Sequence, residues 1–365
     1  MLSPTLSIYF GKHFAKMVGA IFGLSFLLIT IVTYFEFFNR AFRGEAVAGL
    51  ALAMMSLFRV PATTEEALPF AVLYGSIAAF VIANRRLEVV VARAAGVSAW
   101  QFLLPACVVG LLIGVVATTL YNPAAASLLS WSNKLAQEVF IRAEKQPARS
   151  DGEGPIWVRQ SSADSESIIG SVQSTDEGLT LVGATAYVYA KDGKFQERID
   201  APRASYRPGA WRMENATVTA IDSNPRRVDT YDLPTNLSAD EVKGTFLQID
   251  SVSFWTLREL AASARRAGVS ADRYELQYNV LLSRPILLLA MVLIAANVSL
   301  RFSRSRDLGR MIISGVVVGF MLYVVTKIAW DLGSGGIVPP PLAAWLPAIV
   351  ATLFGVTVLL HLEDG

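Results

Sequence analysis

The sequence predicts an α-helical membrane bundle of six transmembrane helices, interrupted by an inserted all-β domain that is jelly-roll-like. Hydrophobic residues make up 53% of the 365 residues and charged residues only 17%, a composition too apolar for a soluble chain of this length. Two clusters of hydrophobic spans also flank one long polar stretch, and each span is near the ~20 apolar residues that a bilayer requires. These observations indicate an integral membrane protein with a large extramembrane insertion.

The hydrophobic spans divide the chain into three parts. Residues 1–130 should hold three transmembrane helices and a short cytoplasmic helix over 84–96. Residues 131–273 should form the β domain with a connecting helix, and residues 274–365 should form three further transmembrane helices. The individual spans are predicted over 17–35, 67–83, 99–121, 276–300, 308–330 and 342–361.

The positively charged residues predict how the chain is oriented. Lys and Arg accumulate in short cytoplasmic loops, and here they cluster before the first span, between the second and third, and between the fourth and fifth. Both termini should therefore be cytoplasmic, and the polar stretch should lie on the outer side. Arg40, Arg43 and Arg59 depart from this pattern. The residues that define it are Lys12, Lys16, Arg85, Arg86, Arg93, Arg301, Arg304, Arg306 and Arg310.

The long polar stretch has the pattern of β-strands. Over 155–250 it consists of short alternating segments bounded by turn residues, which is typical of half-buried strands. Hairpin turns are predicted at Asp192-Gly193 and at Pro208-Gly209. Several such units at short spacing suggest a sandwich or a jelly roll.

A helix is predicted where the polar stretch ends. Residues 253–267 should lie at the outer membrane surface, with a capping box that opens at Thr256 and a stop at Gly268. Its arginines could contact lipid head groups, but a solvated helix face is the more economical explanation. This helix would join the β domain to the second cluster of spans.

The sequence shows no sign of an active site. No histidine occurs between His13 and His361, which excludes a histidine-based triad and a histidine-rich metal site from the polar stretch. The chain also lacks a G-x-x-x-x-G-K-[ST] loop, so it should not bind nucleotide phosphates. We predict no catalytic residue, no metal site and no cofactor.

The connector, residues 84–96, is predicted to be a short amphipathic helix on the cytoplasmic side. Its apolar residues recur at helical spacing, while Arg85 and Glu88 share a different face. Gly96 supplies a stop, and Ser98 opens a capping box that starts the third span at once. A short helix held between two membrane helices is suited to transmitting force, and a cytosolic partner could grip it. The apolar residues are Leu87, Val90, Val91 and Ala94.

Charged residues inside the predicted spans are further candidates, because intramembrane charges are costly and usually functional. Arg284 and Lys327 lead this group. Asp331 lies four residues after Lys327, so these two side chains can equally form an interfacial ion pair. Arg284 can equally extend toward the interface without binding anything.

Three segments resemble one known family. Residues 68–75 read Leu-Pro-Phe-Ala-Val-Leu-Tyr-Gly, the connector continues to Ser98, and residues 335–340 read Gly-Gly-Ile-Val-Pro-Pro and precede Leu346-Pro347. These segments resemble the lipopolysaccharide export permeases of the LptF/LptG type. The order of the spans and the β insertion match as well, so the resemblance covers essentially the whole chain. The connector and the Pro-Pro loop look closer to the LptG branch than to its sister LptF.

The resemblance implies a permease subunit of an ATP-driven exporter in the bacterial inner membrane. Such a subunit extracts lipopolysaccharide from that membrane and passes it to a periplasmic bridge, with its own jelly-roll-like β domain in the periplasm. The implied partners are an LptF-type permease, an LptB-type ATPase dimer, an LptC-type membrane-anchored jelly-roll protein and lipopolysaccharide. No nucleic acid is implied, and ATP hydrolysis would occur on a separate chain.

The resemblance also implies two groups of functional residues. The connector corresponds to the coupling helix, in which Arg85, Glu88 and Arg93 would face the ATPase and Glu88 would be the acidic contact. A second group would attract the lipid phosphates. This group consists of Arg40, Arg43, Arg284 and Lys327.

The chain departs from the family pattern at two positions. Thr33 and Leu281 stand where family members carry lysines that face the lipid phosphates. Arg284 lies about one helical turn from Leu281 and can serve the same face. The direct contacts of those lysines therefore cannot be carried over to this chain.

Other interpretations stay open on the sequence alone. The chain could be the sister LptF-type permease, a mechanotransmitting membrane protein with a periplasmic sensor domain, or a structural anchor for an assembly. Cationic residues facing an open groove would favour transport. A Glu88 whose removal has no effect would favour the anchor.

Overall fold

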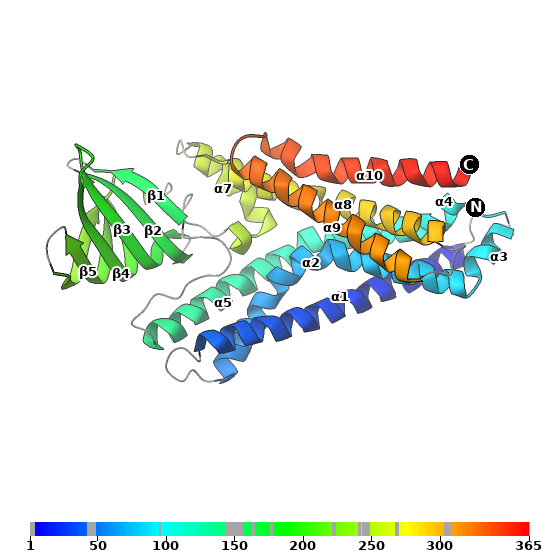
Figure 1. Cartoon of the computed structure of the whole chain (residues 1–365), viewed down its shortest axis with the longest axis horizontal. Helices are drawn as coiled ribbons and strands as arrows, with labels where there is room; N and C mark the ends of the chain where they lie inside the picture. The colour runs from blue at the N-terminus through cyan, green and yellow to red at the C-terminus, as the bar shows by residue number, and fades with distance from the viewer. Residues whose placement is uncertain are drawn as a thin grey trace.

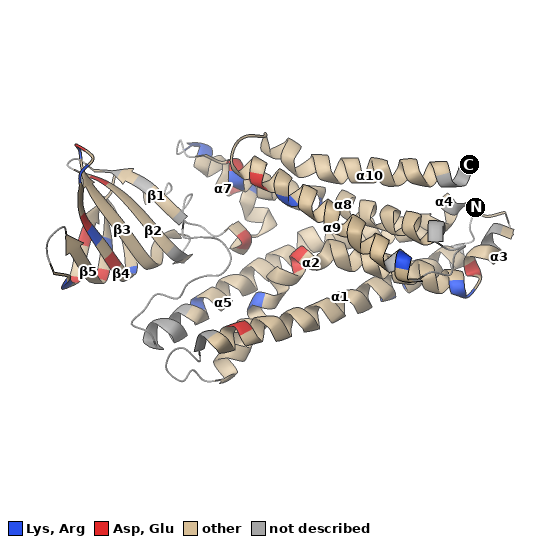
Figure 2. Ribbon diagram, in the orientation of Figure 1, with Lys and Arg blue, Asp and Glu red and all other residues tan. Residues whose placement is uncertain are grey.

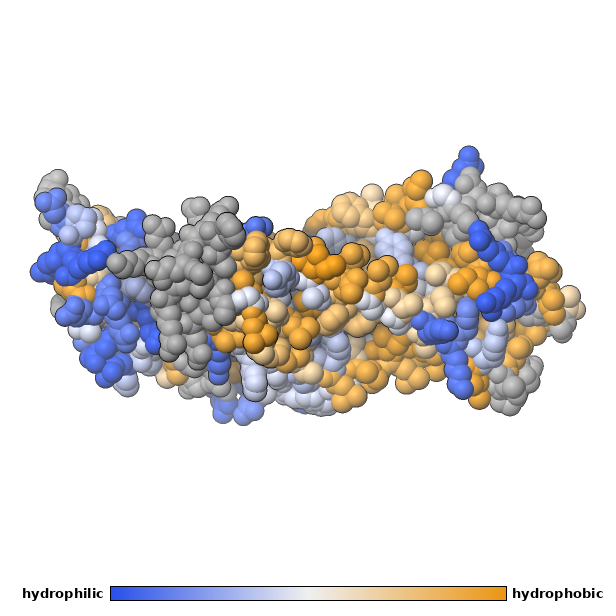
Figure 3. Space-filling model, turned by 90° about the horizontal axis from the view of Figure 1, so that it is seen from below, coloured by the Kyte–Doolittle hydropathy of each residue, from blue (hydrophilic) through white to orange (hydrophobic). Residues whose placement is uncertain are grey.

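The computed structural model has a bundle of long helices with a β-sheet at one end and the short helix α3 at the other (Figure 1). The first helix begins and the last helix ends near α3, so both lie at the end opposite the sheet, as predicted. Hydrophobic residues cover much of the bundle, and hydrophilic ones gather over the sheet and near the opposite end (Figure 3). The residues described are 4–41, 49–94, 96–143, 156–162, 165–175, 178–220, 224–239, 242, 249–266, 270–302 and 308–364.

The predicted membrane spans are confirmed. Within the described residues, six helices are long and apolar enough to cross a membrane, and an antiparallel sheet is inserted between the third and the fourth. The helices are longer than the hydrophobic runs, because polar residues near their ends still pack on neighbouring helices. They are α1 (Pro4–Ala41), α2 (Gly49–Arg85), α4 (Ala99–Val116) with its extension, α8 (Asp272–Phe302), α9 (Leu308–Ser334) and α10 (Pro340–Asp364).

The third span continues well beyond its predicted end at Tyr121. A π-helical turn, η1 (Ala117–Tyr121), follows α4 and leads directly into α5 (Asn122–Ala143). The serines of α5 bond to main-chain carbonyls, and Ser132 Oγ donates to Met55 O of α2 at 2.8 Å. The boundary predicted at residue 130 therefore lies inside a helix.

Close helix contacts hold the bundle together. A Cβ atom on Gly75 of α2 would lie 2.6 Å from the Cα of Val18 in α1. A Cβ atom on Gly114 of α4 would lie 2.4 Å from the Cα of Pro285 in α8. Glycine at these positions lets the backbones approach, which is how membrane helices pack without a hydrophobic driving force. Helix α8 lies at the centre of this packing, whereas α1 and α9 leave most of their apolar side chains exposed.

The inserted domain is all-β, as predicted. Both predicted hairpins are present, with Gly193 at φ +80° and Gly209 at φ +84°, conformations that favour glycine. The described strands pair antiparallel in sequential order, so this sheet has a meander order without the crossed connections of a full jelly roll. They are β1 (Ile156–Ser161), β2 (Ser165–Thr175), β3 (Thr180–Ala190), β4 (Phe195–Arg207), β5 (Ala210–Ala220) and β6 (Arg226–Pro234).

One buried glutamine joins the two edges of the sheet. Gln160 of β1 accepts hydrogen bonds from Trp211 Nε1 of β5 at 3.3 Å and from Thr235 Oγ1, just after β6, at 2.7 Å. The same side chain donates to Ser167 Oγ of β2 at 3.1 Å. These bonds curl the sheet around its apolar interior, where Trp211, Met213 and Leu181 are fully enclosed.

The predicted connecting helix is confirmed as α7 (Phe254–Arg266), which follows a short helical turn, η3 (Ile249–Ser251). The helix begins one residue after the predicted start at residue 253, but Thr256 does not open the expected capping box. The Thr256 hydroxyl instead donates back to Ser253 O at 3.0 Å. Apolar residues of α7, including Leu257, pack on Tyr274 and Leu281 of α8.

Candidate functional site

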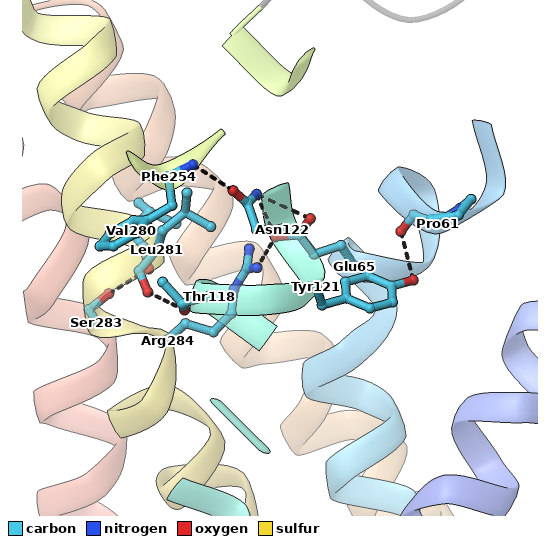
Figure 4. A network of polar contacts seen from close by, with 10 residues as sticks. All are labelled: Pro61, Glu65, Thr118, Tyr121, Asn122, Phe254, Val280, Leu281, Ser283 and Arg284. Atoms are coloured by element: carbon cyan, nitrogen blue, oxygen red, sulfur yellow. Dashed lines mark hydrogen bonds and ion pairs between the residues drawn. The ribbon is translucent and has the colours of Figure 1, made fainter. Parts of the chain in front are cut away.

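Polar groups gather at two places in the membrane part, one inside the bundle on the side toward the sheet and one at the end opposite the sheet. Charged side chains are concentrated over the sheet and near the two ends, and are sparse along the middle of the helices (Figure 2). We call the group near the sheet the outer network. It comprises Pro61, Glu65, Thr118, Tyr121, Asn122, Phe254, Val280, Leu281, Ser283 and Arg284 (Figure 4).

A buried ion pair lies at the centre of the outer network. Arg284 Nη1 of α8 contacts Glu65 Oε1 of α2, and these side chains are only 12% and 8% exposed. Removing two charges from water is costly unless each is paired and hydrogen-bonded. The pair therefore fixes α2 against α8. Arg284, predicted as a lipid-binding residue, has an internal partner in this structure.

Asn122 connects this ion pair to helix α7. Its side-chain amide Nδ2 donates to both Glu65 carboxylate oxygens, at 3.0 and 3.2 Å. Its Oδ1 accepts from the main-chain N–H of Phe254 at 2.9 Å. Asn122 is itself buried, so both ends of its amide are satisfied inside the protein.

The π-helical turn η1 presents the other polar groups of the network. Thr118 Oγ1 donates to Leu281 O of α8 at 2.8 Å, and Tyr121 OH donates to Pro61 O of α2 at 2.9 Å. A π-turn inserts one extra residue into an α-helix and often occurs at functional sites. Here its residues reach α8 and α2, and Asn122, the next residue, reaches α7.

The predictions did not include Glu65 or Asn122. Glu65 lies outside the apolar run predicted for the second span, although an acid within a membrane helix is itself a signal of function. No local pattern marks the π-turn that places Asn122. The contact between Glu65 and Arg284 joins residues 219 positions apart, which spacing alone cannot reveal.

The other predicted lipid-binding residues have different surroundings. Lys327 Nζ lies 3.8 Å from Asp331 Oδ1, and these side chains are 57% and 64% exposed, which is the exposed i,i+4 arrangement considered as an alternative. Lys327 and Arg284 both interact electrostatically with the exposed Glu66 of α2. Arg43 and the side chain of Arg40 lie outside the described part of the chain.

The helix of the connector is shorter than predicted. Helix α3 spans Glu88–Ala94, and Arg85 belongs to the last turn of α2. The prediction of one helix over 84–96 was wrong because Leu87 adopts φ +62° and breaks the helix before Glu88. The predicted stop and cap are confirmed. Gly96 has φ +80°, and Ser98 Oγ accepts from Gln101 N at 3.3 Å.

Glu88 has different neighbours from those predicted. Its Oε1 accepts a hydrogen bond from Tyr9 OH of α1 at 3.1 Å and lies 3.9 Å from Arg86 Nη1. Arg85, which the sequence placed on the same helix face as Glu88, belongs to α2, and the neighbours of Glu88 are Tyr9 and Arg86. The side chain of Arg93 lies outside the described part of the chain.

The connector exposes apolar side chains. Leu87, Val90 and Val91 are 59%, 54% and 65% exposed at the end of the bundle opposite the sheet. The structure thus separates a closed polar network at one end from an open apolar helix at the other. No group of three metal-ligating side chains occurs in the described ranges.

Comparison with known proteins identifies the family. Residues 8–361 match the family described as "Lipopolysaccharide export system permease LptF/LptG". The chain is 22% identical over 367 residues to "Lipopolysaccharide export system permease protein LptG" of Escherichia coli strain K12, covering 98% of both chains. It is 24% identical over 361 residues to the protein of that name from Haemophilus influenzae, covering 95% of both. The six candidate spans agree with the multi-pass inner-membrane location predicted from the sequence. This chain belongs to the LptF/LptG family of lipopolysaccharide export permeases.

Proposed function

We propose that this chain is an LptG-type permease subunit of an ATP-driven exporter, which extracts lipopolysaccharide from the inner membrane and passes it to a periplasmic bridge. The observation that carries the coupling part of this proposal is the exposed apolar face of α3 at the end opposite the sheet. Two relatives that match nearly their whole length are named LptG, which supports that branch over LptF.

The connector is the proposed contact with an LptB-type ATPase dimer. Apolar side chains that are exposed together beside charged residues are typical of protein interaction sites. Leu87, Val90 and Val91 supply the apolar part, and Arg85, Glu88 and Arg93 are the proposed polar contacts. This chain has no phosphate-binding loop, so ATP hydrolysis requires a separate subunit.

The test of coupling is Glu88→Ala. Removing one partner of a buried charged contact at an interface costs roughly 2–5 kcal/mol, so the ATPase should no longer co-purify and export should stop. Glu259→Ala is the control, because Glu259 is an exposed acid that lies on α7, near the sheet and away from the connector. Normal co-purification and export in the Glu88→Ala variant would remove the coupling role. ATP hydrolysis by the purified chain alone would refute the division of roles.

The proposed orientation places the sheet in the periplasm. Cysteine labelling can test this on a Cys107→Ala background, since Cys107 is the one cysteine of the chain. A cysteine replacing Gly193, at the tip of the β3–β4 hairpin, should react with an impermeant reagent added from the periplasmic side. Reaction from the cytoplasmic side alone would contradict the topology.

We also propose that Arg284 contacts the phosphates of the lipid when lipopolysaccharide is bound, with Arg40, Arg43 and Lys327 in support. Arg284 is neutralised by Glu65 in this structure, so a phosphate must compete with that carboxylate. This competition gives two variants with opposite expected effects. Glu65→Gln should strengthen crosslinking of lipopolysaccharide near residue 284, and Arg284→Gln should weaken it.

The control for lipid contact is Lys12→Gln, which removes an exposed cation near the start of α1 that is neither in the outer network nor among the proposed lipid contacts. Crosslinking should be measured per assembled complex, so that a loss of folding is not counted as a loss of binding. If Glu65→Gln leaves crosslinking unchanged in assembled complexes, Arg284 is a structural residue and the lipid site lies elsewhere.

A further inference from the structure

We propose that Asn122 is a positioning residue that seats the first turn of α7 on the membrane bundle and connects it to the buried Arg284–Glu65 pair. Helix α7 is the segment through which the chain returns from the sheet to the fourth span. This role of Asn122 lies in the packing of α7 on the bundle, and it requires neither the proposed substrate nor ATP.

The first two residues of α7 both bond to the segment around the π-turn. The Phe254 N–H donates to Asn122 Oδ1 at 2.9 Å, and Trp255 Nε1 donates to Thr119 O at 3.2 Å. The Phe254 ring also stacks on Tyr278 of α8, with ring centroids 5.2 Å apart and an interplanar angle of 6°. Figure 4 shows Asn122 lying between Glu65 and the start of α7.

The start of a helix needs hydrogen-bond acceptors from outside it. The first N–H groups of an α-helix have no acceptor within the helix, and a preceding Ser, Thr, Asn or Asp usually supplies one. The hydroxyl of Ser253, which precedes α7, contacts the Thr256 hydroxyl at 3.2 Å, and the Phe254 N–H bonds to Asn122, which lies 132 residues earlier in the chain. The beginning of α7 thus depends on a tertiary contact.

The ion pair determines how the Asn122 amide is oriented. An ionised carboxylate can accept hydrogen bonds but cannot donate them. Glu65 therefore binds the Nδ2 end of the amide and leaves Oδ1 facing Phe254. Arg284 in turn holds Glu65. If α7 moved away, the buried Asn122 oxygen and the Phe254 N–H would both lose a partner, which is unfavourable inside the protein. The position of α7 is therefore linked to the packing of α2 against α8.

Hydrogen exchange on the full-length chain in detergent or lipid discs tests this inference. In Asn122→Ala, the amides over 254–258 should exchange about tenfold faster, because one net hydrogen bond of the helix start is lost. The amides of the β3–β4 hairpin should be unchanged. Ser127→Ala is the control, since Ser127 lies on the same helix but is exposed and bonds only to Pro123 O.

A milder variant keeps the test decisive if Asn122→Ala does not fold. Trp255→Phe removes the bond to Thr119 O but keeps an aromatic ring, and it should accelerate exchange over 254–258 about threefold. Unchanged exchange in that segment in Trp255→Phe, or in a folded Asn122→Ala, would overturn the proposal. Equal acceleration across all six candidate spans would do the same, because Asn122 would then only stabilise the bundle.

Discussion

The two ends of the membrane bundle differ in whether their polar groups are buried and hydrogen-bonded and in whether their apolar side chains are covered. At the outer end, Arg284, Glu65 and Asn122 are enclosed and bonded to one another across three segments of the chain. At the inner end, α3 presents exposed apolar side chains, and the bond between Tyr9 and Glu88 is itself exposed. The polar groups of the outer network are bonded within one chain, whereas the inner end exposes apolar side chains that the proposed contact with an ATPase would cover.

The physical consequence is a difference in rigidity. A buried polar network holds its members in one arrangement, because any displacement leaves unpaired groups in a region of low dielectric constant. An exposed helix of seven residues held by turns has no comparable restraint of its own. We therefore expect substitutions at the outer end to change the stability of the isolated chain, and substitutions at the inner end to change its association.

The largest expected effect is that of Arg284→Ala. This change leaves the Glu65 carboxylate buried without its cation, and breaking a buried pair in this way costs about 3–5 kcal/mol. Unfolding of the purified chain by a denaturing detergent measures the loss. Lys327→Ala removes an exposed pair and should cost at most about 1 kcal/mol. Equal losses in the two variants would show that the buried pair contributes no more than the exposed one.

The sheet adds a pH dependence to the outer part of the molecule. Burial, followed by a hydrogen bond donated to Glu197 at 2.5 Å, raises the pKa of Tyr231 above its ordinary value of 10.0. The folded state favours the neutral phenol, so this contribution to stability is present below pH 10.0 and is lost as the pH rises above it.

Tyr231→Phe tests that dependence. Near neutral pH the variant should lose about 1.5 kcal/mol, the contribution of a hydrogen bond to a charged group. It should also show a smaller decrease in stability than the wild type as the pH rises from about 10 to about 12. The unfolding of the sheet, followed by circular dichroism, reports both quantities. An unchanged alkaline decrease would mean that other groups cause it.

A smaller effect is expected at the inner end for Ser98→Ala. The Ser98 hydroxyl accepts from Gln101 N at the start of α4, and loss of such a cap costs about 1 kcal/mol. Unfolding of the isolated chain measures it, with Ser127→Ala as a matched hydroxyl whose removal should be silent. A loss as large as that of Arg284→Ala would contradict the proposed difference between the two ends.

The smallest effect on stability is expected for Val91→Asp. Val91 is exposed on α3, so the isolated chain should change by no more than about 0.5 kcal/mol. Co-purification of the ATPase should nevertheless be lost, because a charge would enter the apolar part of the interface. Val91→Leu, which keeps that face apolar, should retain the ATPase. A destabilised chain would show that α3 already packs against the rest of this protein.

The sequence predicted those features that depend on neighbouring residues. Hydropathy located the spans, and glycine as a residue type marked the turns. The structure shows Gly96, Gly193 and Gly209 at positive φ. The N-cap at Ser98 followed from the residue type and its position before an apolar run. Each of these signals is contained within a few residues, so local rules suffice.

The features that escaped prediction depend on distant residues or on exact register. Leu87 interrupts the connector by adopting a left-handed conformation that its residue type does not favour. Glu65 belongs to α2, but hydropathy placed the start of that span after it. Asn122 faces Glu65 because the π-turn η1 lies between α4 and α5, and this turn has no sequence signature here. Arg284 was chosen as an intramembrane charge, yet its partner could not be inferred.

The π-turn also makes the length of the third span as important as its composition. Each residue turns an α-helix by about 100°, so one additional residue in η1 rotates all that follows by that angle. A chain with one residue deleted between 117 and 121 would still have an apolar segment long enough to cross a bilayer. Its Asn122 equivalent, however, would face away from Glu65 and from the start of α7. At this position an insertion or deletion of a single residue matters more than most substitutions.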